Sequence, residues 1–195
     1  GCNLNDADLR GADLRGVNLT NATLNFADLT GANLANANLT SVNATGANMS
    51  SANFTNANLT RANLQGAYMA RANFNSATMT GVVAIAADLN SANLSKTTLV
   101  GSRFRSANLV NANFVGANQT GGFADFQEAN MAGVNLNLAI FTGSNFVATN
   151  LNGANLRANF TNAIFTNANL VNANVAGGQF NSARMQGASL PIGYT

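Results

Sequence analysis

Residues 47–61 read Ala47-Asn48-Met49-Ser50-Ser51-Ala52-Asn53-Phe54-Thr55-Asn56-Ala57-Asn58-Leu59-Thr60-Arg61, which is one five-residue unit written three times. Each unit consists of a small residue, Asn or Asp, a large apolar residue and two mostly polar residues. The same unit recurs from Cys2-Asn3-Leu4 to Ala188-Ser189-Leu190, so almost no part of the chain lies outside it. A short repeat of fixed period indicates an architecture in which each unit stacks on its neighbours.

The large apolar residue at the centre of each unit sets the register of the repeat. Centres fall at every fifth residue from Leu4 to Gln119, and Leu, Phe or Met occupies 34 of the 38 central positions in the chain. Two irregularities interrupt the count, a two-residue insertion near 120–123 and a one-residue deletion near 157. We therefore predict a single repeat domain over residues 1–190, followed by a tail of residues 191–195.

A period of five fits neither the 3.6-residue period of a helix nor the two-residue period of a strand. A coil that turns a corner every five residues accommodates it, with the central residue and the small residue two positions before it pointing inward. With four units per coil, central residues of the same type stack in successive coils. One wall then contains Phe104, Phe126, Phe146 and Phe165, and another contains Phe141, Phe160 and Phe180. This pattern favours four-sided coils.

Units such as Ala32-Asn33-Leu34-Ala35-Asn36 and Ala12-Asp13-Leu14-Arg15-Gly16 resemble the A(N/D)LXX signature of the pentapeptide-repeat family, and the resemblance covers practically the whole chain. It implies an all-β fold, a right-handed quadrilateral parallel β-helix with Leu, Phe or Met inside and Ala lining the corner. Four units per coil give 38/4, or about 9.5, coils and a rod on the order of 45 Å long. Asn and Asp before each centre suit tight corners, because their side chains bond to nearby backbone groups. Cys2 occupies an inward small-residue position and is predicted to be buried.

Composition narrows the class of protein. Charged residues are 8 % of the chain, against roughly 25 % in ordinary globular proteins, yet the 47 % of apolar residues are too regularly spaced for a disordered segment. A net charge of +2 is too small to predict a nucleic-acid partner. The longest apolar run, residues 82–87, is much shorter than the roughly 20 residues of a membrane-spanning helix. The chain begins within the pattern, so we expect flanking regions, which would be able to anchor it to a membrane. The single cysteine leaves the cellular compartment open.

The sequence offers little for catalysis. It contains no His, and therefore no imidazole base, catalytic triad or histidine metal ligand. One cysteine excludes a zinc–thiolate cluster. Five of the seven acidic residues occupy the corner position that Asn fills elsewhere: Asp8, Asp13, Asp28, Asp88 and Asp125. We therefore predict that the protein is not an enzyme and that it holds no cofactor and no metal.

Apolar residues at outward positions gather in the second half of the chain. The first half has few equivalents beyond Phe26 and Tyr68. Contiguous exposed apolar patches mark interfaces. Outward apolar positions of the second half include Val100, Val110, Val115, Val147, Ile164 and Val171. The predicted interaction surface consists of Val83, Ile85, Phe123, Leu138 and Ile140.

One outward row is unusually regular. Evenly spaced hydroxyl groups on a flat wall would suit a periodic ligand such as a glycan or ice; alternatively, the row is a structural ladder of good strand residues. The row consists of Thr20, Thr40, Thr60, Thr80, Thr120, Thr142 and Thr161, interrupted by Val100.

The function that these observations favour is a non-catalytic structural or protein-interaction solenoid, which we expect to be one domain of a larger protein. It would bind a partner or a second copy through its walls or coil ends, end-to-end or side-to-side. Open coil ends expose unpaired backbone groups; at the C-terminus Pro191 would stop pairing, and Ile192 or Tyr194 would cover the last coil. The resemblance also suggests an alternative, because some acidic members of the family imitate DNA and bind DNA gyrase. A rod with a net charge of +2 is a poor imitation of duplex DNA, which carries one negative charge per about 1.7 Å.

Overall fold

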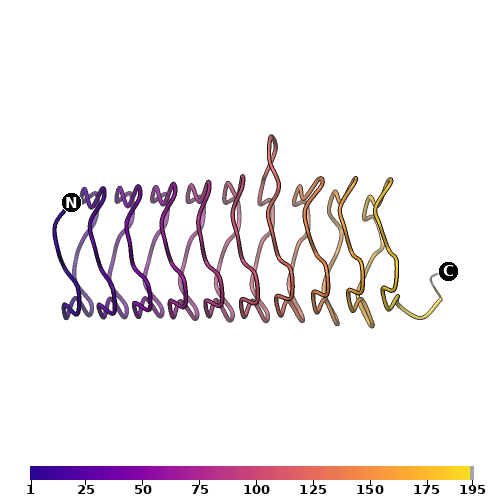
Figure 1. Cartoon of the computed structure of the whole chain (residues 1–195), viewed down its shortest axis with the longest axis horizontal. Helices are drawn as coiled ribbons and strands as arrows, with labels where there is room; N and C mark the ends of the chain where they lie inside the picture. The colour runs from indigo at the N-terminus through magenta and orange to yellow at the C-terminus, as the bar shows by residue number, and fades with distance from the viewer. Residues whose placement is uncertain (194–195) are drawn as a thin grey trace.

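The computed structural model describes residues 1–193, which form a rod of stacked four-sided coils with the two ends of the chain at opposite ends of the rod (Figure 1). The described residues contain no helix and no strand longer than one residue. Isolated parallel β-bridges hold the coils together, and most join residues 20 positions apart, such as Asn33 and Asn53. Twenty residues are four units of five, so the predicted four-sided coil is confirmed.

The four walls are numbered in chain order, and the residues that form the bridges define each wall. Wall 1 runs through Asn3, Thr23, Asn43, Asn63, Val83, Arg103, Asp125, Asn145, Ile164 and Arg184. Wall 2 runs through Asp8, Asp28, Asn48, Tyr68, Asp88, Asn108, Asn130, Asn150, Asn169 and Ser189. Wall 3 runs through Asp13, Asn33, Asn53, Asn73, Asn93, Asn113, Asn135, Asn155 and Asn174. Wall 4 runs through Asn18, Asn38, Asn58, Thr78, Thr98, Asn118, Ile140, Asn159 and Gln179. Walls 2 and 4 are therefore on opposite sides of the rod.

Every backbone N–H of a regular unit has a partner, as residues 33–37 illustrate. Asn33 N–H donates to the coil before it, and Leu34 and Asn36 donate to the coil after it, at 2.7–2.9 Å. Ala37 N–H closes the corner turn on Leu34 O at 3.0 Å. The remaining donor, Ala35 N–H, bonds to the side-chain oxygen of Asn33 at 3.2 Å. This last bond confirms why Asn or Asp precedes the centre: no backbone carbonyl is left for that donor.

Each corner except the one at the deletion, where Ala158 N–H bonds to Leu156 O, is a four-residue turn whose third residue has a positive φ, as the second central residue of a type II turn requires. Glycine adopts this conformation without steric cost and occupies many corners, including Gly31 and Gly153 with φ of 67°. Asn and Ser fill many of the others. Leu138 and Phe26 adopt it as well, with φ of 60° and 58°, and both are large apolar residues in a conformation that disfavours them.

The interior contains the central residues and the small residues two positions before them. Phe104, Phe126, Phe146 and Phe165 stack with ring centroids 4.9–5.3 Å apart behind wall 1. Phe141, Phe160 and Phe180 stack behind wall 4 at 5.0–6.3 Å. Both predicted aromatic columns are confirmed. Rings of the two columns also meet edge to face, as Phe126 and Phe141 do at 5.4 Å.

Predictions made for the two ends of the rod are partly wrong. Cys2 is exposed rather than buried, because it lies in the first coil, where no coil packs on its outer side. Ile192 is 98 % exposed and does not cover the last coil, whereas Pro191 is buried there. Tyr194 lies outside the described residues.

Candidate functional site

The most irregular feature of the rod is the insertion at residues 121–123. Bridges step by 22 residues across it, from Arg103 to Asp125, and the extra residues form a loop that stands above the corner between walls 4 and 1 (Figure 1). Phe123 lies on this loop and is 67 % exposed. Its ring covers Gly143 in the next coil, where a Cβ atom would collide with it.

A buried polar side chain holds the insertion in place. Gln119 occupies a central position, is 1 % exposed and is the only polar residue at any centre of the repeat. Its Nε2 donates to Thr142 O at 2.9 Å, and its Oε1 accepts from Ala124 N–H and from Ser144 Oγ, each at 2.6 Å. In a regular coil a corner N–H reaches the carbonyl above it, as Gly81 reaches Val100. The side chain of Gln119 replaces bonds that the insertion removes, so the loop is fixed to the core.

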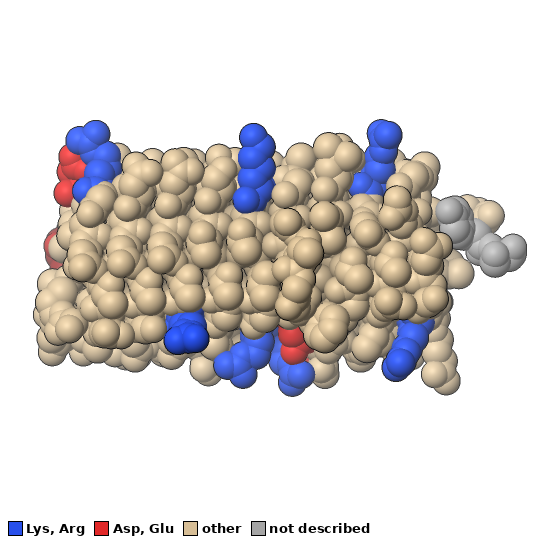
Figure 2. Space-filling model, turned by 90° about the horizontal axis from the view of Figure 1, so that it is seen from above, with Lys and Arg blue, Asp and Glu red and all other residues tan. Residues whose placement is uncertain are grey.

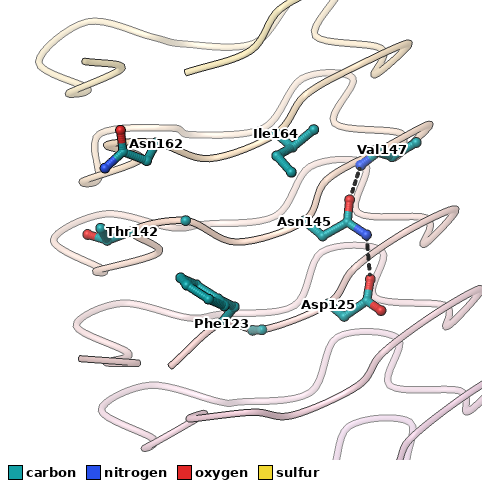
Figure 3. A pocket seen from close by; sticks show the side chains of 9 residues that line it. Phe123, Asp125, Thr142, Asn145, Val147, Asn162 and Ile164 are labelled. Atoms are coloured by element: carbon teal, nitrogen blue, oxygen red, sulfur yellow. Dashed lines mark hydrogen bonds between the residues drawn. The ribbon is translucent and has the colours of Figure 1, made fainter. Parts of the chain in front are cut away.

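Three adjoining hollows connect the apolar residues around this loop. Phe123, Val147 and Ile164 line the largest, a shallow hollow of about 630 Å³ on wall 1, with Thr142 and Asn162 on one side of it and Val147 on the other (Figure 3). Phe123 and Ile140 line a second hollow on wall 4. A third hollow contains Ile140 and Leu138. The residues thus form one apolar belt that crosses wall 4 and turns onto wall 1: Leu138, Ile140, Phe123, Val147 and Ile164.

The structure brings together three of the five residues predicted as an interaction surface and separates the other two. Phe123, Leu138 and Ile140 belong to the apolar belt; Leu138 is 68 % exposed. Val83 and Ile85 are half-buried on and beside wall 1. Val83 forms a β-bridge with Arg103 in the next coil, and Arg103 forms one with Asp125 in the coil after that. Asp125 also forms an ion pair with the Arg105 guanidinium. Charged residues therefore lie between this pair and the belt.

Val147 and Ile164 were predicted to face outward but were not assigned to the interaction surface. Their proximity to Phe123 depends on the insertion, because Phe123 lies outside the regular five-residue count. A second apolar patch, on wall 2, was also missed. Phe26 and Tyr68 are 68 % and 57 % exposed and line one hollow, and the Phe26 ring covers Gly46, where an added Cβ would lie 2.6 Å from it.

The predicted threonine row is placed on wall 4 in the expected register. Asn21 N–H reaches Thr40 O, and Ser41 N–H reaches Thr60 O, so the row rises one coil at a time. Several hydroxyl groups are already engaged at 2.6 Å, each by the Asn two residues before it. These are the hydroxyl groups of Thr20, Thr40, Thr60 and Thr120, which donate to Asn18, Asn38, Asn58 and Asn118. The remaining members, Thr80, Thr142 and Thr161, are half-buried on the same wall.

Ion pairs in the first coils perturb acidic groups without forming a site. A side-chain hydrogen bond from Arg10 lowers the pKa of Asp8 from its ordinary 3.8 to about 2. The matching bond from Arg15, at 2.7 Å, lowers the pKa of Asp13, and the Thr30 hydroxyl lowers that of Asp28. Residues 1–193 bring together no three His, Cys, Asp or Glu side chains able to hold a metal ion. The same residues include no helix long and apolar enough to cross a membrane.

Comparison with known proteins agrees with this geometry. The family model described as pentapeptide repeats matches residues 1–40, 18–56, 52–83, 85–118, 123–157 and 157–190. The chain belongs to the pentapeptide-repeat family. Proteins of this family fold as right-handed quadrilateral β-helices, and the predicted fold class is confirmed. Members are generally structural or interaction proteins rather than enzymes.

Solved pentapeptide-repeat proteins resemble the chain over most of its length. QnrB1, a plasmid-mediated fluoroquinolone resistance protein, is 19 % identical, with a TM-score of 0.56, over 94 % of this chain and 86 % of its own. HetL, involved in heterocyst differentiation regulation in the cyanobacterium Nostoc, is 25 % identical, with a TM-score of 0.45, over 99 % of this chain and 91 % of its own. The likeness to QnrB1 shows the fold alone. A comparison with curated protein sequences finds no match.

Proposed function

We propose that this pentapeptide-repeat rod is a non-catalytic interaction module that binds protein through the apolar belt. The observation that carries the proposal is Phe123: a large aromatic residue, two-thirds exposed, on an insertion that a buried glutamine fixes to the core. Exposed aromatic residues of this kind dominate binding energy at interfaces, and a rigid scaffold lowers the entropy lost on binding. Val83 and Ile85, which charged residues separate from the belt, are not part of the proposed surface.

Paired variants test the belt. Phe123→Ser with Ile140→Asn removes its two central members and returns position 140 to the residue most common there in the repeat. Val83→Asn makes the same kind of change on wall 1 and is the matched control. Proteins captured by the wild type from its native cells are identified, purified and titrated with each variant. We expect Phe123→Ser/Ile140→Asn to weaken binding at least about ten-fold, or 1.4 kcal/mol, and the control to leave it unchanged. Equal binding by all three proteins would contradict the proposal.

A periodic ligand on the threonine row is a second candidate, favoured by the regular spacing of the row. Because four of the hydroxyl groups donate to Asn, these positions offer oxygen lone pairs and suit a ligand that donates, such as a glycan. Sedimentation with insoluble glycans and a freezing-hysteresis measurement test it, with Thr40→Val and Thr60→Val as variants. Absence of binding and of hysteresis in the wild type would leave the row with a structural role.

Gyrase inhibition by DNA mimicry gains little support from this rod. The net charge is +2, and the likeness to QnrB1 extends to the fold only. We expect no effect in a gyrase supercoiling assay, and inhibition there would restore the alternative.

A further inference from the structure

The charged side chains are unequally divided between the two opposite walls 2 and 4. Acidic residues are absent from wall 4 and from both corners that flank it, throughout residues 1–193. Those corners carry four cations: Arg15, Arg61, Lys96 and Arg157. Seen from above, the side from which the insertion loop rises, the rod shows a broad uncharged surface; Lys and Arg side chains lie along its edges, with a few Asp or Glu side chains beside them (Figure 2). The wall 4 side therefore has a charge of +4, of which the Arg15 charge is paired with Asp13.

The opposite side has the opposite sign. Wall 2 and its flanking corners carry five acids, Asp6, Asp8, Asp28, Asp88 and Glu128, and three cations, Arg10, Arg71 and Arg105. Three minus five gives a charge of −2. Complementary charges of this size on two flat walls guide association, although each exposed pair contributes little by itself.

Each of the two walls also carries one exposed apolar patch. On wall 4 this is the part of the apolar belt formed by Phe123, Ile140 and Leu138. On wall 2 it is the hollow lined by Phe26 and Tyr68. The walls thus present a matched pair of features on opposite sides of one molecule: an apolar patch on a wall with positively charged corners, and an apolar patch on a wall that is net negative together with its corners.

The backbone determines how another molecule can meet these walls. All five N–H groups of a unit with Asn or Asp before its centre are already bonded, as in residues 33–37, so walls 2 and 4 offer only scattered free donors, too few to pair an added strand. Contact must be made by side chains. A second copy of the chain is suited to this, because both walls belong to the same coils and their rows of side chains repeat at the same interval along the rod.

We propose that wall 4 of one copy packs against wall 2 of the next, with the Phe123 patch meeting the Phe26 and Tyr68 patch. This assignment rests on the proposed function, since it uses the apolar belt as a binding surface. The contact is heterologous: each copy keeps one wall 4 patch and one wall 2 patch free, so side-by-side assembly does not close and extends into a ribbon as the concentration rises.

Two variants that each remove one patch test the proposal. Phe123→Ser/Ile140→Asn disables wall 4, and Phe26→Gly/Tyr68→Asn disables wall 2. The last two changes install residues that are common at those repeat positions, so circular dichroism should match the wild type. Sedimentation equilibrium should show a mass that rises with concentration for the wild type, and 20.0 kDa monomers for each variant alone. An equimolar mixture of the two variants should form a dimer and nothing larger, since one intact wall of each kind remains.

Each alternative outcome is informative. Full assembly by Phe26→Gly/Tyr68→Asn would overturn the role of wall 2. Monomeric variants whose mixture stays monomeric would also overturn the proposal, because the proposal requires the intact wall 2 of one variant to bind the intact wall 4 of the other. A wild type that is monomeric at every concentration would overturn self-assembly, while Phe123-dependent binding of a different protein would still support the proposed function. High salt should weaken the wild-type assembly, and Val83→Asn should assemble like the wild type.

Discussion

The two halves of the rod are built from the same five-residue unit, but their outward side chains differ in role. Up to residue 119 the coils repeat every 20 residues, and their outward positions are mostly Asn, Thr and Ser that bond to the coils themselves. Beyond it the chain contains an insertion, a deletion and the apolar belt. The second half also holds the larger aromatic core, where the columns of Phe126 and Phe141 meet directly behind the belt. In the regular coils the outward polar side chains form hydrogen bonds within the rod. The irregular coils expose apolar side chains, which remain available to bind another molecule.

The largest expected effect lies in the aromatic core. Phe126 is in contact with four other rings, whereas Phe54 in the first half stacks on Phe74 alone, at 4.8 Å. We expect Phe126→Ala to lower the free energy of unfolding by about 3–5 kcal/mol and Phe54→Ala to fall at the lower end of that range, because aromatic pairs add to the cavity cost. Chemical denaturation of both variants, with hydrogen exchange to locate the loss, tests this. A larger cost for Phe54→Ala would show that the halves do not differ as described.

The buried glutamine should be required only where the insertion is. Gln119→Leu leaves Ala124 N–H with a weaker partner and Thr142 O with none, and should cost about 1–3 kcal/mol. Leu99→Gln, directly beneath it in the column, should cost a similar amount, because a regular coil offers no unpaired groups to the amide. Deleting Gly122 and Phe123 together with Gln119→Leu restores the five-residue count and should recover the stability that Gln119→Leu alone loses. Denaturation midpoints of the three variants decide whether the insertion needs its polar anchor.

Leu138 tests whether the belt is maintained at a cost to the fold. Its φ of 60° is unfavourable for leucine, so Leu138→Gly should raise the free energy of unfolding by up to about 1 kcal/mol while removing part of the belt. Gly153 occupies a corner with a positive φ, and an added Cβ atom there would have open space around it. Gly153→Ala should therefore lower the free energy of unfolding by a comparable amount. Thermal unfolding of both variants measures the difference. Destabilisation by Leu138→Gly would mean that the side chain contributes packing that outweighs its backbone strain.

The smallest effect concerns charge in the first coils. The folded pKa of Asp8, about 2, lies below its ordinary 3.8, so the stabilising contribution of its bond to Arg10 is complete above about pH 4 and is lost as the pH falls toward 2. An NMR titration should report a pKa near 2 for Asp8, and Arg10→Gln should return it toward 3.8. An unchanged pKa in Arg10→Gln would show that the arginine is not its cause.

Particular residues show how far sequence reasoning reached. The columns of Phe104 and Phe141 were predicted because inward positions recur at a fixed interval, and stacking by count suffices to place them. Phe123 was predicted to face outward, but its neighbours Val147 and Ile164 were not identified. Phe123 lies on the insertion, and the five-residue repeat predicts neighbours only for residues within the repeat. Cys2 and Ile192 were misplaced for a related reason: a repeat position specifies burial only where another coil packs on each side.

The sequence by itself therefore determined the coil, its four sides, its interior and the absence of imidazole chemistry, since each follows from residue type at a repeating position. Only the tertiary structure decided which outward residues are neighbours, that Gln119 anchors the insertion, and that acids avoid one wall while apolar patches lie on two opposite ones. The physical reason is that inward side chains face a confined space that few residues fill, whereas outward side chains meet one another through the stacking of coils far apart along the chain.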